Sequence, residues 1–252
     1  EIGIKQGLKF GNWMGYLDAA AFLMEYDDMM EFNFGAWGEI VNYWTDSISG
    51  ELRYEGIGFK SVNVGKTRVS GIEFSLTGHG DINSEVSVNI LAGYTYMNTQ
   101  SLDPNEVYYE NTYIAAYEGT IIDTITELLT YNYTSSDSSA LKYRYKHIAK
   151  LDAEITYKKF AIGSSFRYND FMKNIDLAFT DPIIGTVIPD INESRDKFKN
   201  GDFIIDIRTS YQLNNITKIS LVVNNLLNRE YMTRPATMMP PRTIALQCNM
   251  KI

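Results

Sequence analysis

The sequence has little of what most enzymes and metal proteins use. It holds one cysteine, Cys248, and two histidines, His79 and His147, among 252 residues. A single cysteine excludes an internal disulfide. Neither the Cys and His spacing of a metal site nor a glycine-rich phosphate loop occurs. The two histidines have no recognisable catalytic partner. We therefore predict no enzyme activity, no metal and no cofactor.

Long apolar runs and an excess of positive charge are missing too. No run of about 18 apolar residues occurs, which excludes transmembrane helices. The net charge of -8 argues against nucleic acid as a partner. Mean hydropathy is -0.22, but a membrane β-barrel with alternating faces also averages low. The 18 Tyr, 12 Phe and 3 Trp would suit its aromatic girdles. Composition thus leaves a membrane barrel and a Tyr-rich soluble β protein equally open.

Apolar and polar residues alternate with period two through much of the chain. Segment 151–158, LDAEITYK, and segment 203–212 are examples. Period two predicts strands, whereas a helix needs period 3.6. Strands of about 9 to 11 residues are long enough for a tilted strand to cross a bilayer. The pattern places about nine strands near 1–10, 15–27, 63–77, 85–97, 143–157, 160–170, 202–212, 217–228 and 242–252.

The connections between these strands alternate in length. Short ones lie near 11–14, 78–84, 158–159 and 213–217. Long ones lie near 28–62, 98–142 and 170–200, and the connection at 230–240 is of middle length. Outer-membrane barrels have this rhythm, with short turns on the periplasmic rim and long loops outside. The alternation therefore predicts two rims, each holding one set of connections.

The order of several motifs carries a family resemblance. A strand ending in Asn225, Leu226, Leu227, Asn228 and Tyr231 is followed by a loop, and Pro241 and Arg242 then open the last strand. Upstream, Asn63, Gly65, Gly71 and Glu73 fill an N-x-G…G-x-E strand pattern. The chain resembles TonB-dependent outer-membrane receptors over nearly its whole length. It departs from them in ending on Ile252, where closing strands commonly carry an aromatic residue.

The resemblance implies a fold and a set of partners. It implies an all-β, antiparallel transmembrane β-barrel, with residues 1–252 as about nine C-terminal strands of a barrel of about 22. The plug domain is absent from this chain. Residues 1–10 and 242–252 are then expected to pair with strands elsewhere in the same protein. The partners would be outer-membrane lipid, the upstream strands and plug, and the TonB complex reached through the plug.

The function implied is that of an outer-membrane receptor in a Gram-negative bacterium. Such a receptor binds a bulky, scarce nutrient and imports it with TonB-derived energy. The nutrient classes are siderophore-bound iron, haem, cobalamin and oligosaccharide. Two alternatives remain: a small complete outer-membrane barrel acting as a porin or adhesin, and a soluble all-β binding module.

Candidate site residues fall into two groups. Aromatic residues in the long loops are expected to contact ligand, or alternatively to pack the loops together: Trp37, Tyr43, Trp44, Tyr108, Tyr109 and Tyr113. Charged strand residues are expected to face the lumen or plug, or alternatively to form salt bridges and hydrogen bonds within the barrel wall: Glu73, Asp152, Glu154, Arg167, Asp206 and Arg208. Gln247 is also expected to point inward. The residues expected to face lipid are Val88, Ile90, Ile155, Ile162, Ile205, Ile207, Leu221 and Leu246.

Overall fold

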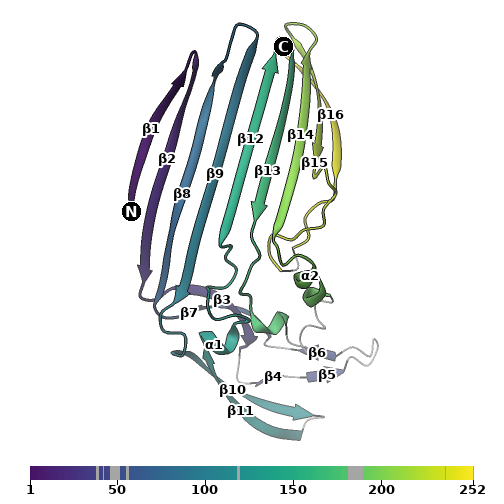
Figure 1. Ribbon diagram of the computed structural model, residues 1–252. Coiled ribbons are helices and arrows are strands. Elements are labelled where there is room, and N and C mark those ends of the chain that lie inside the picture. Colours follow the sequence, from purple (N-terminus) through teal and green to yellow (C-terminus); the bar gives the residue numbers. More distant parts are fainter. Residues whose placement is uncertain are drawn as a thin grey trace.

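The main element of the computed structural model is one antiparallel sheet of nine long strands (Figure 1). The structure describes residues 1–37, 40–41, 43–45, 52–54, 57–117, 120–180, 190–235 and 237–251. The strands of the sheet, in spatial order, are β1 (Ile2–Phe10), β2 (Trp13–Tyr26), β8 (Thr67–Asp81), β9 (Val86–Ser101), β12 (His147–Tyr157), β13 (Phe160–Asn169), β14 (Asp202–Gln212), β15 (Thr217–Asn224) and β16 (Thr243–Met250).

All nine predicted strands are confirmed, with shifted ends. The strand predicted at 63–77 runs from Thr67 to Asp81, and the one predicted from 143 begins at His147. Tyr143 has a φ of 58° and Asn225 a φ of 49°. This left-handed backbone cannot continue a strand, so Tyr143 lies outside β12 and β15 ends at Asn224 instead of 228. Short turns and long connections alternate between two rims, as predicted (Figure 1).

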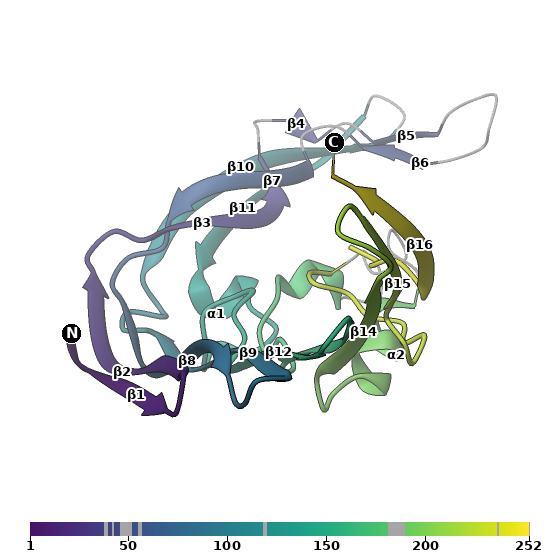
Figure 2. The same ribbon diagram turned by 90° about the horizontal axis from the view of Figure 1, so that it is seen from above.

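The sheet is curved and open. Figure 2 shows it as an arc, with β1 and β16 on its two sides. Within the described residues β1 pairs only with β2 and β16 only with β15. The architecture is therefore a partial barrel. Among the described residues no helix has the length and apolar character needed to cross a membrane.

The long connections are more ordered than the sequence predicted, because they contain strands and helices of their own. These are β3 (Met30–Ala36), β4 (Ile40–Val41), β5 (Tyr43–Thr45), β6 (Leu52–Tyr54), β7 (Ile57–Asn63), β10 (Val107–Tyr117), β11 (Thr120–Thr130), α1 (Tyr131–Thr134), the 3-10 helix η1 (Leu177–Phe179) and α2 (Ile191–Lys197). β3 pairs with β7 and β10 with β11, both antiparallel. We call the described residues of connections 27–66, 102–146, 170–201 and 225–242 the loop head.

The strand register divides the nine-stranded sheet into two faces, since directly opposite residues share a face. The aliphatic face carries all eight residues predicted to face lipid; Val88, Ile155 and Ile162, for example, lie side by side. The opposite face, here the charged face, carries all seven polar residues predicted for the lumen, and Glu154 and Arg208 there flank Gly163. The division into two faces follows the predicted alternation.

Two aromatic belts border the aliphatic face. Near the short turns it carries Phe10, Trp13, Tyr157, Phe160 and Tyr211. Near the long connections it carries Tyr94, Tyr96, His147, Tyr168 and Phe203. Eight residues separate the belts along β13, which corresponds to roughly 27 Å of strand. With a strand tilt of about 40°, the apolar band is roughly 20 Å tall, close to that of outer-membrane barrels.

The core of the loop head lies against the charged face. Val69, on that face, clusters with Val62, Val64, Tyr131 and Leu141. Tyr131 belongs to α1, which lies inside the arc of the sheet in Figure 2. The charged face is therefore the concave one.

Candidate functional site

The four long connections meet around one hollow of about 620 Å³. Each connection contributes to its wall, so residues far apart in sequence come together beyond the end of the sheet. We call it the loop-head hollow. It is lined by Met30, Glu31, Phe32, Phe59, Tyr143, Arg144, Phe179, Arg234, Pro235 and Thr237.

Aromatic rings form one wall of this hollow. Phe59 and Phe179 lie 5.8 Å apart between ring centroids, and Phe34 lies within 5.3 and 5.6 Å of them. Phe59 and Phe32 remain largely exposed. Aromatic pairs at such distances stabilise each other and present flat apolar surfaces. This wall suits a ligand with flat or apolar groups.

Glu31 supplies an acidic group that is nearly buried. Glu31 is 7% exposed, and neither carboxylate oxygen has a hydrogen-bond partner. The nearest cation is Arg144, whose Nη2 lies 3.8 Å from Oε1. Burial raises the pKa of Glu31 to about 7, although Arg144 and Lys142 oppose the shift. Near neutral pH the carboxyl group can therefore donate or accept a hydrogen bond.

A buried polar network holds the wall behind Glu31. The Nζ of Lys142 donates to Asp176 Oδ1 at 2.6 Å and to Thr134 Oγ1 at 2.9 Å, and it also donates to Asn33. Lys142 is 0% exposed and Asp176 1% exposed. The hydroxyl of Tyr143 donates to the second oxygen of Asp176. Burial lowers the pKa of Lys142, and Asp176 counteracts that shift. The network joins β3, α1 and η1 into one unit.

Three of the predicted loop aromatics have described side chains, and they pack within the loop head. Trp37 and Tyr109 meet edge to face at 5.0 Å, and Lys60 lies over both rings. The Tyr108 hydroxyl pairs with Thr134 Oγ1 at 2.8 Å, and burial raises its pKa. None of the three lines the loop-head hollow. These contacts match the alternative in which the loop aromatics pack the loops together. Contact between these residues and a ligand stays a prediction.

The other three loop aromatics can be placed only by their backbone. Tyr43 and Trp44 belong to β5, and Tyr113 belongs to β10. Their side chains lie outside the described part of the structure.

The charged face carries one tight cluster around Arg208. Its guanidinium donates to Asp152 through two nitrogens, at 2.7 and 2.8 Å, and to Glu154 Oε2 at 2.9 Å. The guanidinium crosses β13 at Gly163, where an added Cβ would lie 2.7 Å from its central carbon. Glycine at this position is what lets the side chain reach from β14 to β12.

The remaining residues predicted to face the lumen differ in whether they form ion pairs. Arg167 pairs with Asp206 at 3.1 Å, and Asp206 also accepts from the backbone N–H of Asn225 at 2.7 Å. Glu73 lines a hollow of about 530 Å³ with Asp18 and Lys150. Within the described residues Glu73 has no ion-pair partner. All the charged candidates except Glu73 therefore form ion pairs within the barrel wall.

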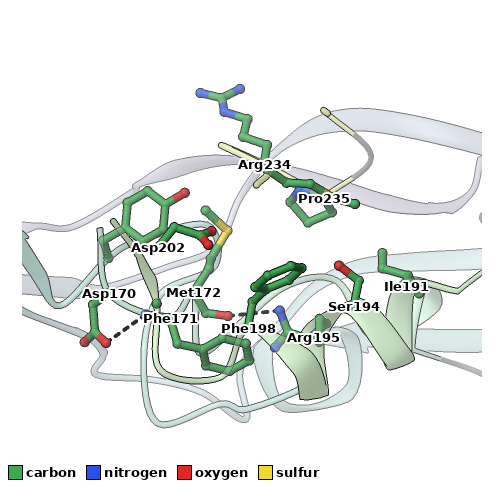
Figure 3. Close-up of a pocket in the computed structure, with 13 residues that line it drawn as sticks. Asp170, Phe171, Met172, Ile191, Ser194, Arg195, Phe198, Asp202, Arg234 and Pro235 are labelled. Atoms are coloured by element: carbon green, nitrogen blue, oxygen red, sulfur yellow. Dashed lines mark hydrogen bonds between the residues drawn. The ribbon is translucent and has the colours of Figure 1, made fainter. Parts of the chain in front are cut away.

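A smaller cavity of about 70 Å³ separates α2 from the last long connection (Figure 3). Arg195 Nη1 donates to the carbonyl oxygen of Met172 at 3.0 Å, and its guanidinium lies 4.5 Å from the Phe171 ring. Figure 3 shows the Arg234 guanidinium pointing away from this cavity. The cavity is too small for a bulky ligand, and Arg195 braces its wall.

Among the described residues that line the loop-head hollow, none belongs to the aromatic residues predicted to contact ligand. Glu31 alternates with Met30 and Phe32 in the segment MEFNF, a period-two signal that could have predicted β3. Nothing in the local sequence marks Phe179 or Arg234, because only the tertiary arrangement brings them to Glu31.

Comparison with known proteins relates the sheet from β1 to β15 to one family. The family model described as TonB dependent receptor-like, beta-barrel matches residues 1–226. A comparison with curated proteins gives no match.

Solved structures share the fold. The siderophore receptor PiuA from Acinetobacter baumannii is 19% identical, with a TM-score of 0.54 over 98% of this chain and 27% of that one. The ferric-catecholate import receptor Fiu from K12 E. coli is 21% identical, with a TM-score of 0.54 and the same coverage. The copper transporter OprC is 12% identical, with a TM-score of 0.53 over 99% of this chain and 30% of that one. The chain thus spans less than a third of the length of these structures, and by its family match it belongs to the TonB-dependent receptor-like β-barrel family.

Proposed function

We propose that the chain is part of a Gram-negative outer-membrane receptor that binds a bulky, scarce nutrient and imports it with energy delivered through TonB. The loop-head hollow is the observation that carries the proposal. All four long connections contribute to it, and it lies beyond the end of a sheet with a lipid-compatible convex face. A ligand held there would sit at the outer mouth of the barrel.

The chemistry of the hollow narrows the nutrient class. Its aromatic wall combines with two guanidinium groups, those of Arg144 and Arg234, and with the single carboxyl group of Glu31. Flat anionic groups fit such a surface better than a neutral oligosaccharide does. We therefore favour siderophore-bound iron or haem over cobalamin and oligosaccharide. The names of two structural neighbours, a siderophore receptor and a ferric-catecholate import receptor, agree with this choice.

The open edges of the sheet support further strands as partners. In lipid, the unpaired N–H and C=O groups of β1 and β16 would each cost several kcal/mol. We propose that these edges pair with other strands of the same protein and that a plug domain fills the concave side. Glu73, which has no ion partner among the described residues, is the lumen candidate best placed to meet a plug. The plug would carry the contact with TonB.

The two alternatives explain less of the structure. A small complete barrel requires β1 and β16 to pair, and within the described residues they do not. A soluble module would leave the aliphatic face in water, where Ile155, Ile162 and Leu221 are each more than 40% exposed. Exposed apolar surface of this extent marks a membrane or interaction face.

Uptake by cells tests the proposal. Cells with and without the full gene product receive ferric siderophores, haem, cobalamin or an oligosaccharide in turn as the only source of the limiting nutrient. We expect gene-dependent growth on an iron source. A variant with Phe59→Ala and Arg234→Ala should lose it, while Tyr133→Ala, an exposed tyrosine of the loop head that does not line the hollow, should not. Growth that never depends on the gene would refute the proposal.

A further inference from the structure

On β8 and β9 the aliphatic face ends at a polar boundary near the long connections. Its outermost apolar row contains Ile72, Tyr96 and His147. The next row outward on the same face holds Ser70 and Asn98 on β8 and β9 and the exposed Leu23 on β2, and the row after it holds Glu25, Arg68 and Gln100. If the aliphatic face contacts lipid, as proposed above, the acyl chains end at the Tyr96 row and headgroups lie beyond it.

A second hollow, of about 440 Å³, begins where that boundary lies. We call it the basic hollow. Four cationic side chains line it with one carboxylate: Arg144, Lys146, Lys173, Lys199 and Asp170. Asn98, Thr99 and Ser139 add amide and hydroxyl groups. These groups together offer charge and hydrogen-bond donors suited to phosphate oxygens.

Three contacts connect the basic hollow to the aliphatic side of the sheet. Lys146 Nζ lies 5.6 Å from the ring centroid of Tyr96, a residue of the outer aromatic belt. The Tyr168 hydroxyl, of the same belt, donates to the carbonyl oxygen of Asn200 at 3.3 Å, which holds the segment next to Lys199 against the belt. Asn98 lies on the aliphatic face by register.

Part of the positive charge in this hollow is uncompensated. Lys173 pairs with Asp137 at 3.0 Å. The Oδ1 atom of Asp170 accepts from the backbone N–H of Phe171 at 2.7 Å. Across the residues that the structure describes, neither Lys146 nor Lys199 has an ion-pair partner. Lys146 and Lys199 therefore place positive charge beside the apolar band, where an anionic group could pair with it.

We infer that the basic hollow binds the phosphate group of an outer-leaflet lipid, whose acyl chains lie along the aliphatic face. Lys146 and Lys199 supply the charge, and the Tyr96 row marks the junction of headgroup and chain. The inference rests on the membrane placement proposed above. It assigns these two lysines to lipid and not to the imported nutrient.

Lipid binding by the full gene product in detergent micelles tests the inference, with bisphosphorylated lipid A and its dephosphorylated form as probes. We expect tighter binding of the phosphorylated probe. A basic residue near an anionic surface changes affinity roughly fivefold, so Lys146→Ala with Lys199→Ala should weaken binding roughly 25-fold. The pair Lys146→Arg with Lys199→Arg should retain it. Lys158→Ala, beside Glu85 in the short turn between β12 and β13, is the matched control and should leave binding unchanged.

Several results would overturn the inference. Equal affinity for the two probes would do so, as would equal affinity of the wild type and the double alanine variant. So would a double variant that loses nutrient uptake but keeps lipid. If the alanine variant does not fold, the salt dependence of wild-type binding tests the inference instead. Phosphate binding through exposed lysines must weaken with added salt, and binding that salt leaves unchanged would overturn the inference. A protein that stays soluble without detergent would refute the membrane placement itself, whereas a detergent-dependent protein without phosphate preference refutes only this inference.

Discussion

Replacing Lys142 by methionine should loosen the loop head without unfolding the sheet. Lys142→Met keeps much of the side-chain volume but removes the hydrogen bonds to Asn33, Thr134 and Asp176. It also leaves the Asp176 carboxylate, 1% exposed, without its cation. Breaking a buried ion pair from one side costs roughly 3–5 kcal/mol. We expect that loss in the local opening free energy of the head, because the nine-stranded sheet does not depend on this contact.

Amide hydrogen exchange in the full gene product measures this loss residue by residue. Protection should fall in β3, α1 and residues 174–176 and stay unchanged in β12 and β13. Lys173→Met is the matched control, because its ion pair with Asp137 is largely exposed and should contribute less than about 1 kcal/mol. Adding Asp176→Asn to Lys142→Met should recover part of the loss, since the stranded charge is gone. Equal exchange in the two single variants would refute the reasoning.

The remaining predictions concern pH, a glycine contact and the two faces. Because the folded pKa of Glu31 is about 7 against an ordinary 4.5, the contribution of Glu31 to the stability of the head should be fully present below about pH 4.5 and fall by roughly 3 kcal/mol between pH 4.5 and 7; limited proteolysis should show this, and Glu31→Gln should abolish it. Gly163→Val should cost roughly 1–3 kcal/mol in thermal unfolding because the guanidinium above it must move, whereas Gly93→Val, with its nearest atom at 3.9 Å, should stay near wild type. Ile207 lies midway between the aromatic belts, so Ile207→Arg should cost roughly 2–4 kcal/mol in a lipid-based unfolding titration; an equal effect of Ser210→Arg on the charged face would contradict the assignment of faces.

Much of the sheet could be predicted because a strand is marked by a pattern among neighbouring residues in the sequence. Alternation of apolar and polar residues needs only neighbours in sequence, and the face of Ile155 or Glu154 follows from its parity. The alternation of short and long connections then predicted which connections lie together on each rim. The loop head resisted prediction because its elements depend on distant partners. β3 pairs with β7 across a separation of about twenty residues or more, and the aromatic residues of the loops can either bind a ligand or pack on each other.

The sequence by itself determined the strand order, the two faces and the family, because each depends on short-range pattern and on motifs in a given order. Tertiary structure alone decided where the chemistry lies. Lys142 and Asp176 are 34 residues apart, and Glu31 meets Arg144 and Arg234 only where the long connections converge. Burial then changes what these groups can do. A glutamate that would be ionised in water becomes half-protonated near neutral pH, since desolvation penalises its charged form.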